Sequence, residues 1–275
     1  MTRALRLIPI PLLMVLMAVP GGLRAQPPAA GQAEVSAKTW GDNRAAIEDA
    51  LRNGKVVGEE TIPVGVTKPK KMQLEPGGPV THFAFKNIPP GRHSGFWESW
   101  KSEVAAYEVD KLIGLDMVPP TVEKRVKGDL GAAIMWCAPV KNFDEMGGVP
   151  QASQIPGRYV AKWVRQMVRA KMFDNLIGNR DPNQGNWLVD PAWNLILIDK
   201  TRAFTSDKNL VHKEMGNVDL PLWEKMQALT EESLEAAIGK WVGRGEIRAM
   251  LDRREKMKQV FDRLIASKGD TVIIR

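Results

Sequence analysis

The sequence predicts an α+β fold, with a β-rich first half that holds one main helix and a mostly helical second half. Within 55–88, short runs of β-branched and aromatic residues are separated by turns that contain Pro and Gly, which is typical of a strand meander. Within 159–177, and again within 247–265, apolar residues recur at the spacing of amphipathic helices. The length of 275 residues suits one two-lobed domain or two small ones.

The first half is expected to begin with a short helix over 42–51, which Asn53-Gly54 ends. A three-strand meander follows, with β-rich stretches at 56–57 and 61–66, then 71–74, then 81–86. In the third strand Phe83 and Phe85 alternate with polar or small residues and so share one face.

A helix is expected over 96–113, because its apolar residues fall near helical spacing and Gly114 follows as a stop. The prolines within 117–122 make that stretch extended. Residues 132–138 are typical of a buried strand. In the second half, two short β-like pieces at 186–189 and 195–198 lie between the helices.

The N-terminus has the order of a secretory signal. Basic residues come first, an apolar run without acids follows, and small residues end the segment, so 1–25 is expected to be a signal peptide cleaved after Ala25. A membrane anchor is the alternative, but the 14-residue run contains Pro9 and Pro11 and is too short to span a bilayer. Residues 26–40 are then expected to be a flexible linker.

Export changes the interpretation of the charge. The formal net charge of +7 falls to +4 when Arg3, Arg6 and Arg24 leave with the signal, so nucleic-acid binding loses its main support. The single cysteine, Cys137, excludes an intrachain disulfide, and we expect it to be a buried small apolar residue.

The segment most suggestive of chemistry lies between the helices. Asp181 and Asn186 stand in a polar loop after a helix that Gly178 ends, and Asp199 follows four apolar residues. An acid at the end of an apolar strand needs compensation, and carboxylate and amide oxygens are the ligands that Mg²⁺ and Mn²⁺ prefer. Taken alone, Asp181 is better explained as a turn residue, because the loop is rich in turn formers.

This segment resembles the catalytic loop of the phosphoinositide-kinase-like branch of the protein-kinase fold, which reads D-R-H-x-x-N and is followed by an apolar strand ending in Asp. Asp181 and Asn186 are five residues apart, and Asn186 and Asp199 thirteen apart, as in that pattern. HipA-type serine kinases and the secretory-pathway (Golgi casein kinase-like) kinases have related forms. The resemblance implies that Asp181 is catalytic and that Asn186 and Asp199 hold the metal.

The resemblance also implies a strand lysine that grips phosphates and a helix acid that holds this lysine. Lys86 ends the third strand and Glu103 lies in the following helix, so they are the expected pair. The expected phosphate-covering hairpin includes three further nucleotide-binding residues: Gly65, Thr67 and Lys68. On this basis the domain is kinase-like and two-lobed, with an N-lobe over 41–140 and a C-lobe over 141–275.

Three departures from the pattern stand out. Pro182 replaces the usual Arg and Asn183 the usual His, while Lys200 follows Asp199 in place of Phe. The Lys200 charge is expected either to weaken metal binding or to contact a phosphate.

Three other residues receive expected roles. We expect Asp174 and Asn179 to brace the loop. Trp136 is expected to be a core residue or to line an adenine pocket. None of the three histidines, His82, His93 and His212, stands at metal-ligand spacing with an acid or Cys.

The expected function is that of an exported phosphotransferase, periplasmic or extracellular, which moves the γ-phosphate of ATP to a hydroxyl of a protein Ser/Thr or a small molecule with Mg²⁺ or Mn²⁺. A nucleotide-binding pseudokinase, an AMP-transferring enzyme and a structural envelope protein remain alternatives. No Walker-type loop and no G-x-S-x-G motif occurs in the sequence. A hydrolase built on Ser and His has no motif to recommend it.

Overall fold

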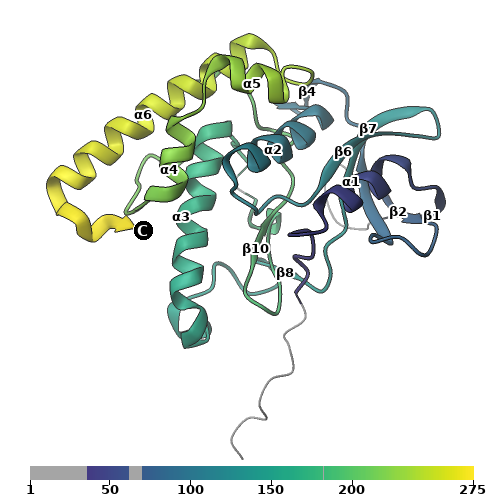
Figure 1. Cartoon of the computed structure of the whole chain (residues 1–275), viewed down its shortest axis with the longest axis horizontal. Coiled ribbons are helices and arrows are strands. Elements are labelled where there is room, and N and C mark those ends of the chain that lie inside the picture. Colours follow the sequence, from purple (N-terminus) through teal and green to yellow (C-terminus); the bar gives the residue numbers. More distant parts are fainter. Residues whose placement is uncertain (1–35, 62–69, 182) are drawn as a thin grey trace, which may run out of the picture. The chain divides into compact units, whose positions relative to one another are not determined.

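A five-stranded antiparallel sheet is the framework of the first half of the chain (Figure 1). The computed structural model describes residues 36–61, 70–181 and 183–275. The strand order is β1-β2-β3-β7-β6, and the bounds are β1 Val56–Thr61, β2 Lys70–Leu74, β3 His82–Lys86, β6 Thr121–Val126 and β7 Asp129–Met135. The predicted meander is present as β1, β2 and β3. The signal peptide, the strand residues expected at 62–66 and Pro182 lie outside the described residues.

Helices cover both faces of this sheet, because side chains alternate between its faces along each strand. Phe83 and Phe85 pack in one apolar cluster with Ile47 and Leu51 of α1 (Arg44–Asn53). On the opposite face, Ala132 and Ile134 of β7 pack against Trp100 and Val104 of α2 (Trp100–Ile113), with Ala84 of β3 beside them. Lys86 stands two residues after Ala84 and therefore points to the face that α2 covers.

The helix predicted over 96–113 is wrong at its start. Phe96–Glu98 is strand β5, which pairs with β4 (Gly91–His93) in the register His93 to Phe96. Ser94 and Gly95 both have positive φ, as a two-residue type I′ hairpin requires. The helix itself begins at Trp100, after Ser99, whose side-chain oxygen accepts a hydrogen bond from the Lys101 backbone N–H.

The strand predicted over 132–138 begins and ends three residues earlier, as β7. A second two-residue turn, at Lys127 and Gly128, also has positive φ at both positions and joins β6 to β7. The prolines predict an extended stretch over 117–122, but 117–120 belong to no strand and the paired strand β6 begins only at Thr121.

The second half is mostly helical, as predicted. The α-helices of the described residues after 140 are α3 Val160–Ile177, α4 Leu220–Gln227, α5 Glu231–Ile238 and α6 Arg244–Lys268. Gly178 ends α3 with a φ of 67°, a conformation that glycine adopts at low cost. The sequence patterns predicted α3 and most of α6 but neither α4 nor α5. Among the described residues, no helix is both long enough and apolar enough to cross a membrane.

Two small sheets complete the second half. The predicted β-like pieces are β9 (Trp187–Val189) and β10 (Leu195–Leu197), and β8 (Lys141–Asn142) pairs with β9. Asn186 belongs to a short 3-10 turn before β9 instead of to the strand. Close to the C-terminus, β11 (Val218–Asp219) pairs in parallel with β12 (Ile273–Ile274).

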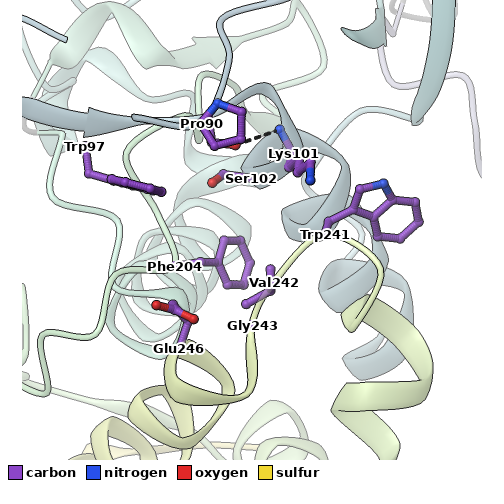
Figure 2. Close-up of a pocket in the computed structure, with 10 residues that line it drawn as sticks. Pro90, Trp97, Lys101, Ser102, Phe204, Trp241, Val242, Gly243 and Glu246 are labelled. Carbon is purple, nitrogen blue, oxygen red and sulfur yellow. Dashed lines mark hydrogen bonds between the residues drawn. The ribbon is translucent and has the colours of Figure 1, made fainter. Parts of the chain in front are cut away.

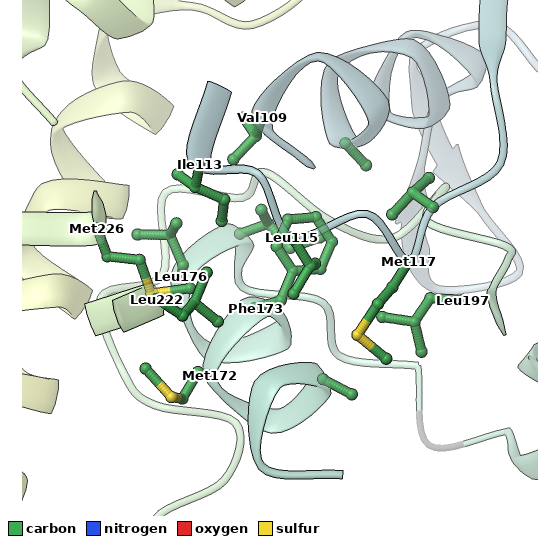
Figure 3. Close-up of a cluster of buried hydrophobic side chains, with 14 of the residues drawn as sticks. Val109, Ile113, Leu115, Met117, Met172, Phe173, Leu176, Leu197, Leu222 and Met226 are labelled. Carbon is green, nitrogen blue, oxygen red and sulfur yellow. The ribbon is translucent and has the colours of Figure 1, made fainter. Parts of the chain in front are cut away.

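The largest apolar core joins α2 to the helical half (Figure 3). Val109 and Ile113 of α2 lie in one cluster with Phe173 and Leu176 of α3 and with residues of α4. The N-terminal end of α2 packs instead on the sheet. Because α2 is fixed on both sides, the residues it carries have defined positions relative to the sheet and to α3.

Candidate active site

The ammonium group of Lys86 lies between two carboxylates. Its Nζ is 2.7 Å from Oε1 of Glu103 and 2.8 Å from Oδ1 of Asp199. Lys86 ends β3, Glu103 lies in the first turn of α2, and Asp199 follows β10, so three distant parts of the sequence meet at this point. The Lys86 side chain is only 7% exposed, which makes its compensation by the carboxylates necessary.

These contacts determine the charges of Lys86 and Asp199. Burial alone would lower the pKa of Lys86, but the carboxylates of Asp199 and Glu103 raise this pKa above its ordinary value. Burial alone would raise the pKa of Asp199, but the Lys86 ammonium holds it below the ordinary value. Lys86 and Asp199 are therefore both ionised at neutral pH.

Asp199 is held by its backbone and by its neighbours. Its φ is 54°, in the left-handed region that few non-glycine residues adopt. The hydroxyl of Thr201 donates to Oδ1 of Asp199 at 2.9 Å. One residue earlier, the backbone N–H of Ile198 donates to the carbonyl of Asn186 at 3.1 Å, which places Asp199 beside the polar loop.

Asp181 and Asn186 form the second pair of the site. The Asn186 side-chain amide donates to Oδ2 of Asp181 at 3.2 Å, and the backbone N–H of Asn183 donates to Oδ1 of Asp181 at 3.1 Å. Asn183 in turn accepts a hydrogen bond from the backbone N–H of Gly185 with its side-chain oxygen. The turn chemistry of the loop thus fixes the carboxylate of Asp181.

The structure excludes one of the two roles expected for Lys200, and the other, weaker metal binding, stays a prediction. Its side chain is completely buried, and its Nζ lies 3.2 Å from Oδ1 of Asp174 on α3. Asn179 also donates to Oδ1 of Asp174, as expected for a pair that braces the loop. The expected phosphate contact of Lys200 is wrong, because Asp174 neutralises and encloses the ammonium. The backbone N–H of Lys200 donates to Oε2 of Glu103 at 3.0 Å.

The donors expected to bind a divalent cation fit this purpose. The amide nitrogen of Asn186 is used on Asp181, which leaves its oxygen as a donor for a cation. Within the described residues, the contacts of Asp199 all involve Oδ1, which leaves Oδ2 for a second bond. One amide oxygen and one carboxylate oxygen are hard ligands that suit Mg²⁺ or Mn²⁺.

Not all of the predicted nucleotide-binding residues can be placed. Gly65, Thr67 and Lys68 lie outside the described residues. Trp136 follows β7 and is partly exposed. Nζ of Lys71 lies 5.3 Å from the centre of the Trp136 ring. The role of Trp136 at an adenine pocket stays a prediction.

Sequence reasoning gave no role to Arg202 or Glu98. Nε of Arg202 lies 3.0 Å from Oε1 of Glu98, and one terminal nitrogen lies 3.8 Å from Oδ1 of Asp181. Neither residue belongs to a motif, and only the position of Arg202 three residues after Asp199 could have drawn attention to it.

A separate pocket opens at the N-terminal end of α2 (Figure 2). Trp97 of β5, Lys101 and Ser102 of α2, Phe204 and the loop before α6 surround it. None of the candidate catalytic or metal-binding residues lines this pocket.

Comparison with solved structures identifies the fold. The Golgi casein kinase aligns with a TM-score of 0.61 at 15% identity, over 85% of this chain and 80% of that one. Hydra Fam20, solved with sugar, aligns with a TM-score of 0.62 at 14% identity, over 83% of this chain and 91% of that one. The Helicobacter pylori proinflammatory kinase CtkA aligns with a TM-score of 0.51 at 12% identity, over 79% of this chain and 98% of that one. The chain has a two-lobed, kinase-like fold.

In this kinase-like fold, the sheet with α1 and α2 belongs to the smaller lobe and the other helices to the larger one. Another structure of the Golgi casein kinase contains Mn/ADP. No family model and no curated protein matches the sequence. At identities of 12–15% the likeness concerns the fold, so the chemistry has to be argued from the residues of this chain.

Proposed function

We propose that the protein is an ATP-dependent phosphotransferase that moves the γ-phosphate of ATP to a hydroxyl group. The observation that carries the proposal is the position of Lys86 between Glu103 and Asp199, with the Asp181–Asn186 pair beside it. A cation held by acids from two lobes, next to oxygen ligands and a fixed carboxylate, is what phosphoryl transfer requires, since positioning and charge neutralisation supply most of the catalysis.

Each side chain has a role in this reaction. Lys86, oriented by Glu103, binds oxygens of the α- and β-phosphates. Asp181 hydrogen-bonds the acceptor hydroxyl and takes its proton as the new oxygen–phosphorus bond forms. The bond between the γ-phosphorus and the bridging oxygen breaks, and ADP leaves with the electron pair. The hydrogen bonds from Asn186 and Asn183 hold the Asp181 carboxylate in place during the transfer.

Asn186 and Asp199 would hold Mg²⁺ or Mn²⁺, which supplies neutralisation of the charge on the phosphate oxygens. The Mn/ADP complex of the Golgi casein kinase, whose fold is similar, supports testing Mn²⁺ first. Lys68, Gly65 and Thr67 are proposed as further contacts to the phosphates.

The acceptor is a hydroxyl of a protein Ser/Thr or of a small molecule. We propose that the protein acts after export, in the periplasm or outside the cell, because 1–25 has the pattern of a signal peptide. N-terminal sequencing of the exported protein tests this directly. A first residue other than one close to Gln26 would contradict cleavage after Ala25.

A labelling experiment tests the reaction. The purified chain is incubated with ATP labelled in the γ-phosphate, Mn²⁺ and mixed protein and small-molecule acceptors. Transfer is expected from the wild type but not from Asp181→Asn or Asp199→Asn. Asp262→Asn is the matched control, because Asp262 is an exposed carboxylate of α6 whose described contact is with Lys258. Equal labelling by all four proteins would contradict the assignment.

A repeat with α-labelled ATP and a measurement of MnATP binding separate the alternatives. Label that is transferred only from α-labelled ATP would indicate AMP transfer. Binding of MnATP without transfer of either label would indicate a pseudokinase.

A further inference from the structure

Arg202 lies at the edge of the proposed catalytic site. One terminal nitrogen of its guanidinium is 3.8 Å from Oδ1 of Asp181, and its side chain is 20% exposed. Asp181 therefore has a guanidinium beside it at the position where an acceptor hydroxyl and the γ-phosphate would meet. No role follows for Arg202 from the kinase-like motif that led to Asp181 and Asp199.

Two residues of strand β5 in the β4–β5 hairpin fix the orientation of Arg202. Glu98, which is only 6% exposed, binds Nε of Arg202 at 3.0 Å. The guanidinium carbon lies 4.2 Å from the centre of the Phe96 ring, as in a stacked cation–π contact. The planar group is held on one edge and one face, so its terminal nitrogens stay directed at the site without a large entropy cost on binding.

Two other cations near the site, Lys86 and Lys200, are already paired with carboxylates. Lys86 is engaged by Glu103 and Asp199, and Lys200 by Asp174, so neither stands next to Asp181. In the described part of the chain, Arg202 is the cation that lies within 4 Å of Asp181. A phosphoryl group in transfer carries charge on its equatorial oxygens, and a guanidinium can bind two of them at once.

We propose that Arg202 is a catalytic residue, whose terminal nitrogens bind oxygens of the γ-phosphate during its transfer. The proposal rests on the function proposed above. The acceptor oxygen bonds to the γ-phosphorus, its proton passes to Asp181, and the bond to ADP breaks. The guanidinium exchanges its 3.8 Å contact with Asp181 for the phosphate oxygens, and Glu98 and Phe96 hold it as it does so.

A purely structural role for Arg202 predicts different kinetics. If the residue only braced β5 against the Asp181 loop, its loss would lower stability and ATP affinity together with the rate. A residue that acts on the transferred phosphate affects kcat and leaves the KM for ATP unchanged.

The test measures MnATP hydrolysis by the full chain, with water in place of the unidentified acceptor. Arg202→Met is expected to lower kcat by about 10²- to 10³-fold, the usual effect of removing one preorganised donor, with the KM for ATP unchanged. Thermal stability is expected to fall as well, because Glu98 is left buried without its partner, so KM and rescue are the readouts that decide. Added guanidinium ion should restore part of the rate. Arg202→Lys keeps the charge but loses the planar guanidinium, so its kcat should also be low. This variant replaces Arg202→Met in the test if Arg202→Met does not fold.

Arg248→Met is the matched control, since Arg248 is an exposed arginine of α6 whose described partner is Glu231. Wild-type kcat in Arg202→Met, alongside inactive Asp181→Asn and Asp199→Asn, would overturn the role of Arg202 and leave the proposed function intact. A joint loss of rate, ATP affinity and stability without rescue by guanidinium would also overturn it, in favour of a brace. A wild-type chain that neither hydrolyses ATP nor transfers phosphate would overturn both proposals.

Discussion

At the scale of single residues, Glu103 uses its two carboxylate oxygens for different contacts. Oε1 binds the ammonium of Lys86, and Oε2 accepts the backbone N–H of Lys200. A glutamine or aspartate could not keep both contacts with the same charge and reach. The same side chain therefore orients the phosphate-binding lysine and fixes the backbone beside Asp199, so any shift of α2 would disturb both.

Cys137 tests how tightly the segment after β7 is enclosed. Burial raises the pKa of its thiol to about 12, and the side chain is 7% exposed. At pH 8 the thiol is therefore protonated and enclosed, whereas in the unfolded chain its pKa returns to the ordinary range and the reactive thiolate becomes accessible.

We expect iodoacetamide at pH 8 to leave Cys137 unmodified in the folded protein and to modify it fully in guanidinium chloride, as mass spectrometry can measure. Because the pKa is raised, reactivity should increase as the pH rises towards 12. Rapid modification of the folded protein at pH 8 would show that this strand end is open.

At the scale of elements, a buried ion pair joins the segment after β10 to α3. Lys200 and Asp174 lie 3.2 Å apart and are both enclosed. Burial alone would raise the pKa of Asp174, but Lys200 and His212 hold it below its ordinary value. Asp174 thus contributes stability above the pKa of the unfolded chain, and this contribution is lost as the pH falls through the lowered folded value.

Lys200→Met should leave the Asp174 carboxylate buried without its partner and lower the free energy of unfolding by about 3–5 kcal/mol at pH 7. The loss should shrink as the pH falls towards 4, because the unpaired carboxylate takes up a proton. Asp174→Asn combined with Lys200→Met should be less destabilised than Lys200→Met alone. Urea unfolding at several pH values measures all three effects.

Lys258→Met is the control, because Lys258 binds Asp262 at 2.7 Å on the exposed surface of α6. That pair is exposed and screened by solvent, so it should contribute far less than the buried pair, even though its ion-pair distance is shorter. A Lys200→Met variant no less stable than Lys258→Met would contradict the importance of the buried pair.

The elements also show which parts of the fold could be predicted from the sequence. The candidate pair Lys86 and Glu103 could be identified because the kinase resemblance implies a strand lysine and a helix acid in this order along the chain. The β4–β5 hairpin is not predicted from the sequence, because Phe96 and Trp97 continue the apolar spacing of α2. The signal for the hairpin is the turn at Ser94 and Gly95, which directly precedes these two residues. Arg202 was missed because its contacts with Glu98 and Asp181 exist only in three dimensions.

At the scale of the whole molecule, the proposed nucleotide site uses both lobes. Lys86 and Glu103 come from the sheet and α2, whereas Asp199, Asn186 and Asp181 come from the helical half. A ligand bound by both sets stabilises the folded chain as a unit, by about 2.7 kcal/mol when its concentration is 100 times its Kd. For a domain of this size we expect a rise in Tm of about 5–10 °C.

The prediction is a rise of this size with MnADP in the wild type and in Asp181→Asn, but not in Asp199→Asn. The difference follows from the proposed roles, because Asp181 acts on the acceptor, whereas Asp199 would hold the metal that neutralises the charge of the phosphates. Each variant is compared with itself without ligand by differential scanning calorimetry, so a change in intrinsic stability cancels. The exposed Asp262→Asn serves as the matched carboxylate control. A full rise in Asp199→Asn, or none in the wild type, would mean that nucleotide and metal do not bind between Lys86 and Asp199.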